Sequence, residues 1–151
     1  MNRVQATAVC AGSVTGIGAG PPTALDRAFI ALQNAYRPHG GLSRLRGLAC
    51  GRVADAGGLV DTGAVFGFRW HDDLWIPLFQ FDTSAVPVGS VAAGPRRVVA
   101  ELGRGFDGWA LAQWFVHPCD SLAGQMPIEC LPLRLPEVLE AARADRVAAA
   151  G

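Results

Sequence analysis

The sequence predicts a mainly α-helical protein with a small β-hairpin. Apolar residues recur at helical spacing in residues 24–36 and 95–102, whereas a β-prone aromatic run is confined to residues 65–81. Prolines and glycines separate these segments. Half of the 151 residues are hydrophobic and 17% are charged. A buried core is therefore expected, in one domain or in one domain with an appendage.

The first helix is expected at residues 24–36, with Thr23 before it. Its apolar face is predicted from positions i, i+4, i+7 and i+11 of a helix. These residues are Leu25, Phe29, Leu32 and Tyr36. Residues 1–22 are rich in Ala, Gly, Ser and Thr and end in two prolines, so we expect them to form a flexible arm.

A second helix is expected at residues 44–52, capped by Ser43. A turn at residues 55–58 follows, and residues 59–65 are either a short third helix or an irregular connection. Residues 23–82 thus form the expected N-terminal module, which is helix-turn-helix-like or winged. The candidate DNA-binding residues are Arg44, Arg46 and Arg52.

The β-prone run predicts a hairpin with strands at residues 65–70 and 75–81 and a turn at residues 71–73. Pro77 is expected to restrict the second strand to a sheet edge. The aromatic residues of the hairpin could stack nucleobases or pack against helices. The chain contains no lysine, and its 13 arginines balance 13 acidic residues. This balanced charge favours packing of the aromatic residues against helices over stacking on nucleobases.

The C-terminal module is expected at residues 94–151. A helix at residues 95–102 is closed by glycines, and a second helix carries Trp109 and Trp114. Pro118 is expected to end that helix at His117. Pro127 and Pro136 each suit the first position of a later helix, where a missing N–H costs nothing.

Two segments, one in each module, carry a recognisable motif. Residues 109–131 follow the order W-x4-W-x3-P-x3-L-x-G-x2-P-x3-L, and residues 76–82 read IPLFQFD. This pattern resembles the toxin-binding domain of the Xre/MbcA/ParS-like antitoxins, over roughly Gly40 to Arg146. Family members usually carry asparagine after the helix-ending proline, whereas Pro118 is followed by Cys119 and Asp120. The Asp120 carboxylate could supply an equivalent turn bond.

The resemblance implies an antitoxin-like binding protein that neutralises a cognate toxin enzyme by covering its active-site cleft. It also implies a RES-type NAD-consuming enzyme as partner, a homodimer, and promoter DNA bound through the N-terminal module. The expected partner-binding residues are Pro118, Asp120, Leu122, Gly124, Gln125, Pro127 and Ile128. The expected structural core residues are Trp109, Trp114, Phe79 and Phe81.

Two other functions remain open at this point. The chain could be a DNA-binding transcriptional regulator without a toxin partner, which would require its candidate arginines to line one face. It could also be a stand-alone protein that kept the fold and lost both partners. We expect no enzymatic activity, because the sequence does not offer a nucleophile, a base and an oxyanion site together.

No cofactor or metal is expected. The glycines of residues 16–20 lack the strand and helix of a dinucleotide-binding turn. His117, Cys119 and Cys130 lack a fourth zinc ligand, and His71-Asp72-Asp73 is expected to be a solvated turn rather than acid–base machinery. The four cysteines predict free thiols in a reducing cytoplasm, and no apolar run is long enough to span a membrane.

Overall fold

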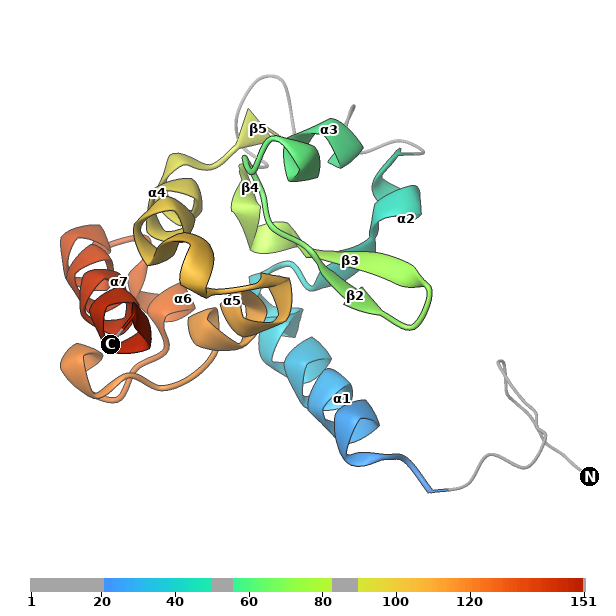
Figure 1. Ribbon diagram of the computed structural model, residues 1–151, viewed down its shortest axis with the longest axis horizontal. Helices are drawn as coiled ribbons and strands as arrows, with labels where there is room; N and C mark the ends of the chain where they lie inside the picture. Colours follow the sequence, from blue (N-terminus) through green and yellow to red (C-terminus); the bar gives the residue numbers. More distant parts are fainter. Residues whose placement is uncertain (1–20, 50–55, 83–89, 151) are drawn as a thin grey trace, which may run out of the picture. The chain divides into compact units, whose positions relative to one another are not determined.

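The computed structural model describes residues 21–49, 56–82 and 90–150 (Figure 1). The chain divides into two compact units, Met1–Ala31 and Leu32–Gly151. The described residues are mostly helical, with a three-stranded antiparallel sheet and a separate pair of short strands. The predicted fold class, mainly α with a small β-hairpin, is confirmed at this level. The flexible arm predicted at residues 1–22 lies almost wholly outside the described residues, and the predicted boundary between residues 82 and 94 stays a prediction.

Helix α1 spans Ala24–Tyr36, as predicted. Thr23 caps it reciprocally with Asp26, because the Thr23 hydroxyl accepts from the Asp26 N–H at 3.1 Å while the Asp26 carboxylate accepts from the Thr23 N–H at 2.9 Å. The predicted apolar face is wrong at its first position, since Leu25 is 58% exposed. Its other members are buried: Phe29, Leu32 and Tyr36.

The region after α1 differs from the prediction. A 3-10 turn, η1 (Arg37–His39), ends in two glycines with positive φ, and strand β1 (Leu42–Arg44) follows. The helix predicted at residues 44–52 is therefore shorter, α2 (Leu45–Ala49), and Ser43 lies in a strand rather than at a helix cap. Pairing of β1 with a strand distant in sequence explains the difference, since such pairing outweighs local propensity.

The predicted hairpin is confirmed, with strands β2 (Phe68–Trp70) and β3 (Asp73–Pro77). The prediction that Pro77 places its strand at an edge is wrong, because the strand order is β1-β3-β2 and β3 is central. Pro77 is tolerated at the last position of β3, where its missing N–H is not needed. The next residue, Leu78, supplies the donor and bonds the Gly41 carbonyl at 2.9 Å.

A 3-10 turn interrupts the strand that the sequence predicted to continue to Phe81. This turn, η2 (Leu78–Gln80), leads into β4 (Phe81–Asp82), which pairs with β5 (Ser90–Val91). Helix α3 (Ala56–Asp61) begins within the segment predicted as a turn, residues 55–58, although Asp55 itself lies outside the described residues. Buried residues of α2, α3, β3 and β4 and of the connection between α3 and β2 form one apolar cluster: Leu48, Ala56, Val65, Ile76 and Phe81.

The side-chain amide of Gln80 is buried and fully hydrogen-bonded. Its Oε1 accepts from the Phe66 N–H at 2.8 Å, while its Nε2 donates to the carbonyls of Phe66 and Pro77, each at 3.0 Å. This amide therefore replaces the backbone pairing that the chain loses where β3 ends.

An aromatic cluster joins this region to helix α5 (Gly108–Phe115). The ring of Phe115 stacks on Phe66 with centroids 5.8 Å apart and lies 4.8 Å from Phe79. The Tyr36 hydroxyl donates to the Ala112 carbonyl at 2.7 Å, and burial raises the Tyr36 pKa far above its ordinary value. Of the two phenylalanines predicted as core, Phe81 is buried and Phe79 is only half-buried.

The C-terminal helices gather at one side of the second unit (Figure 1, yellow to red). They are α4 (Ala93–Leu102), α5, α6 (Pro127–Cys130) and α7 (Leu135–Ala150), with 3-10 turns η3 (Gly103–Gly105) and η4 (Asp120–Leu122) between them. Helix α4 packs against α7. The buried side chains along these two helices include Val98, Leu102, Val138, Leu139 and Ala142.

The predicted helix ends need small corrections. Helix α5 is capped by Asp107, whose carboxylate accepts from the Ala110 N–H at 2.8 Å, and it ends at Phe115 rather than at His117. Pro127 is the first residue of α6, as predicted. Pro136 is the second residue of α7, not the first.

Helix α5 begins in close contact with the segment that leads into β2. A Cβ atom at Gly108 would overlap the backbone carbonyl of Gly67, and a Cβ at Gly67 would lie 3.0 Å from the Trp75 carbonyl oxygen. The two glycines therefore allow the helix and the sheet to approach at backbone distance.

Replacing Gly108 by alanine should destabilise the protein by about 3 kcal/mol, because the start of α5 must move away from the sheet. The matched control is Gly57→Ala in α3, where a Cβ meets no atom within 4 Å and alanine should be neutral or stabilise by about 0.5–1 kcal/mol. Urea unfolding monitored by circular dichroism measures both. Equal stabilities for the two variants would contradict this packing.

Candidate partner-binding site

The turn between α5 and α6 is closed by backbone hydrogen bonds. The Cys119 N–H donates to the Gln125 carbonyl at 3.0 Å, and the Gly124 N–H donates to the Cys119 carbonyl at 2.9 Å. Ala123 and Gly124 adopt left-handed φ values of 60° and 78°. Asp120 contributes its backbone carbonyl, which accepts from the Ala123 N–H, in place of the side-chain bond that the sequence suggested. The turn therefore has one defined shape.

The structure divides the seven predicted partner-binding residues into two groups. Three are buried and support the turn from beneath: Leu122, Pro127 and Ile128. Four are exposed to solvent: Pro118, Asp120, Gly124 and Gln125. The buried group explains why the turn is fixed, and the exposed group defines the surface it presents.

The two tryptophans predicted as core are only half-buried, and each links α5 to another element. The Trp114 indole N–H donates to the Asp145 carboxylate on α7 at 2.6 Å. The Trp109 ring lies edge-on to Phe68 at 5.2 Å and stacks with Trp70 at 6.0 Å. Both tryptophans thus position the helix from which the turn leaves.

Arg134 holds the turn to the start of α7, a role that the sequence analysis missed. Its Nη1 donates to the Gln125 side-chain oxygen at 2.7 Å. Its Nε and Nη2 donate to the two carboxylate oxygens of Glu137 at 2.8 and 2.9 Å. The hydrogen bond between the two side chains raises the Arg134 pKa and lowers the Glu137 pKa. The only signal in the sequence for this contact was the i,i+3 spacing of Arg134 and Glu137.

An exposed apolar side chain lies next to this arginine. Leu133 is 93% exposed, and Pro132 before it is also exposed. Backbone bonds to the Cys130 carbonyl from the N–H groups of Leu133 and Arg134, at 3.3 and 2.7 Å, fix the segment. We call the exposed turn residues Pro118, Asp120, Gly124 and Gln125, together with Pro132 and Leu133, the C-terminal surface.

A hollow of about 420 Å³ borders this surface. Its lining is mostly apolar and consists of His39, Phe79, Ala92, Gly94, Pro95, Ile128, Leu131 and Pro132. Ile128 therefore reaches solvent-accessible space even though it is buried, and Pro132 belongs both to the hollow and to the C-terminal surface. The hollow is large enough to receive an apolar side chain of a partner.

The candidate DNA-binding arginines do not form the predicted helical face. Arg44 lies in β1 and Arg46 in α2, and both pair with the Asp73 carboxylate, Arg44 at 3.4 Å. The Arg44 guanidinium also lies 5.1 Å from the centre of the Trp75 ring. Arg52 lies outside the described residues. These contacts partly neutralise the two arginines and reduce the charge available for phosphate.

The remaining predictions concern free thiols, metal sites and membrane-spanning helices. Cys119 is half-buried and Cys130 is buried, and both are free thiols as predicted. The remaining cysteines and residues 16–20 lie outside the described residues. Among the residues that the structure describes, no cluster of three or more His, Cys, Asp or Glu could hold a metal ion. In the same part of the chain, every helix is too short or too polar to cross a membrane.

Comparison of the chain with protein-family models, with curated proteins and with solved structures finds no match.

Arg134→Gln should release the turn from α7 and return the Glu137 pKa toward 4.5. Because the folded pKa is lowered, the stabilising contact is present at neutral pH and is lost as the pH falls through the folded value, below 4.5. Carbon-13 NMR of the Glu137 carboxylate measures the titration, and hydrogen exchange at Gly124 measures the release. An unchanged Glu137 titration in the variant would contradict the contact.

Proposed function

We propose that this protein is an antitoxin-like binding protein that neutralises a cognate toxin enzyme by covering its active-site cleft. The C-terminal surface is the proposed contact. The observation that carries the proposal is Leu133, which is 93% exposed in a segment that Arg134 fixes to the turn. Leu133 adjoins exposed Pro132, which also lines the apolar hollow, and a contiguous apolar patch of this kind favours protein binding.

The sequence resemblance to the Xre/MbcA/ParS-like antitoxins supports the same assignment. The residues that carry it, from Trp109 to Leu131, include all of α5 after its first residue, the closed turn and α6. A turn of one shape binds with little loss of conformational entropy, because its backbone is already ordered. We therefore propose that the exposed residues of the turn and Leu133 contact the toxin together.

The N-terminal part of the second unit completes the proposal. The β2–β3 hairpin would be the wing, and α2 and α3 the short helices, of a degenerate helix-turn-helix-like module. Dimerisation, promoter binding, a RES-type partner and a cytoplasmic location remain parts of this proposal. The transcriptional-regulator alternative is less favoured, because Arg44 and Arg46 already pair with Asp73.

Since the resemblance implies a toxin gene beside the antitoxin gene, the experiment is co-expression in a bacterial host with the product of the neighbouring reading frame. The wild-type protein should relieve growth arrest by that product, and Leu133→Asp should weaken binding at least ~30-fold, as expected for an anchoring apolar residue. Growth and the dissociation constant from calorimetry are the two readouts.

The matched control is Leu25→Asp, which changes another exposed leucine, in the first unit, in the same way. It should retain binding and growth rescue. A neighbouring product that is not toxic, or a Leu133→Asp variant that rescues as well as the control, would overturn the proposal.

A further inference from the structure

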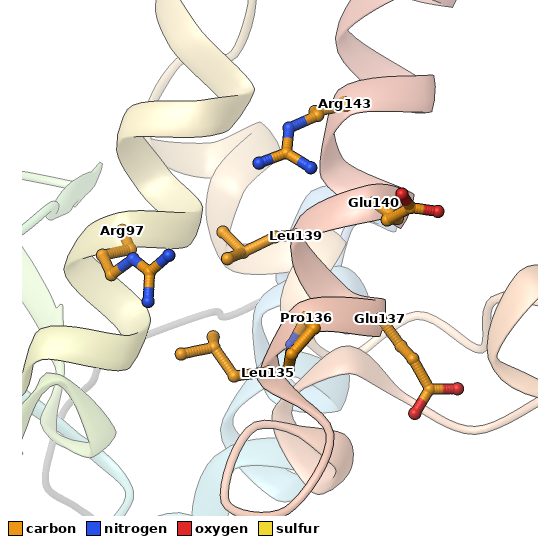
Figure 2. Close-up of a pocket in the computed structure, with 7 residues that line it drawn as sticks. All are labelled: Arg97, Leu135, Pro136, Glu137, Leu139, Glu140 and Arg143. Carbon is orange, nitrogen blue, oxygen red and sulfur yellow. The ribbon is translucent and has the colours of Figure 1, made fainter.

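A second hollow, which the proposed function does not use, lies between α4 and α7 (Figure 2). Its volume is about 370 Å³. It is lined by Arg97 from α4 and by Leu135, Pro136, Glu137, Leu139, Glu140 and Arg143 from α7. We call it the α4–α7 groove.

The groove combines an apolar floor with two positive charges. The Arg97 and Arg143 guanidinium groups point into the space between the helices, beside the side chains of Leu135 and Leu139 (Figure 2). The carboxylates of the two lining glutamates point away from this space (Figure 2). The inner part of the groove is therefore cationic above an apolar surface, although both charge types occur among its lining residues.

Two of the four charged residues that line the groove already have partners. Glu137 pairs with Arg134, and the Arg143 Nε lies 3.1 Å from the Glu101 carboxylate, which leaves other N–H groups of Arg143 free to donate. Arg97 forms no ion pair or hydrogen bond with the described residues, and it is exposed. An arginine over an apolar floor favours a ligand that brings one carboxylate and one apolar group.

We propose that the α4–α7 groove binds a segment of a partner protein in which a carboxylate side chain is next to an apolar side chain. The carboxylate pairs with Arg97 and with the free donors of Arg143, and the apolar side chain covers Leu135 and Leu139. This rests on the proposed function in taking the partner to be a protein, and it adds the chemistry of the segment that is recognised.

A protein segment fits this groove better than a nucleic acid does. The two helices carry four arginines and four acidic residues, so they do not offer the continuous positive charge that a run of phosphates requires. A single carboxylate meets only the two arginines that face the groove. The exposed Leu133 stands two residues before Leu135, so a protein bound at the C-terminal surface can extend into the groove.

The test is selection of random short peptides, displayed on phage, against the immobilised full-length protein and its variants. The wild type should enrich peptides with Asp or Glu next to an apolar residue. Arg97→Gln should weaken these peptides about 10-fold, the loss of one charge-assisted contact. Arg97→Glu should abolish their binding and enrich peptides with Lys or Arg at the acidic position.

The matched control is Arg96→Gln, which removes the same charge from the neighbouring residue of α4 outside the groove. It should select the same acidic peptides as the wild type. Equal enrichment by Arg97→Gln and Arg96→Gln would overturn the inference, as would peptides without acidic residues. If the protein self-associates and Arg97→Gln abolishes that association, the groove binds a second copy of the chain. This result would also overturn the inference.

Failure of this inference can be told apart from failure of the proposed function. The peptide selection contains no toxin, and the Leu133→Asp experiment does not change the groove. If the protein neutralises the toxin but selects no acidic peptides, only the inference about the groove is rejected. If neutralisation fails but Arg97-dependent peptide selection persists, the toxin is rejected as the partner. The inferred chemistry of the bound segment then stands.

Discussion

The buried amide of Gln80 is the constraint on which the arrangement of the second unit depends. It bonds Phe66 and Pro77, so it fixes the entry to β2 against the end of β3. That position brings the Phe66 and Phe79 rings against Phe115 of α5. Without the amide, three buried backbone groups would lose their partner, at a cost of about 1–3 kcal/mol for each. The close approach of α5 to the sheet requires the same geometry.

The position of α5 in turn sets the surface that we assign to partner binding. Trp114 ties α5 to Asp145 of α7, and Arg134 ties the start of α7 to Gln125 in the turn. These two contacts close a ring of helix, turn and helix around buried Leu122 and its neighbours. The side chains at the C-terminal surface are therefore presented on an ordered backbone, which lowers the entropic cost of association. An exposed leucine on such a backbone is more useful for recognition than one on a mobile loop.

Local signals in the sequence predicted the parts of the fold that neighbouring residues determine. Thr23 and Pro127 marked helix starts, and the β2–β3 hairpin followed from its aromatic run. Strand β1 was missed because its pairing partner is more than 30 residues away, and local propensity there favoured a helix. At the candidate site, the turn was predicted, but which of its residues are buried was not. Burial of Leu122 and exposure of Leu133 depend on how α7 packs, which spacing alone does not reveal.

The most direct test of the central claim is photo-crosslinking from position 133 in the native host. A benzophenone amino acid would replace Leu133, with the same replacement at Leu25 as the reference, since both side chains are exposed. The account predicts one abundant crosslinked protein from position 133, an enzyme joined through peptides at its active-site cleft, and no such product from position 25. The same crosslinks from both positions, or a product joined far from any active site, would contradict it.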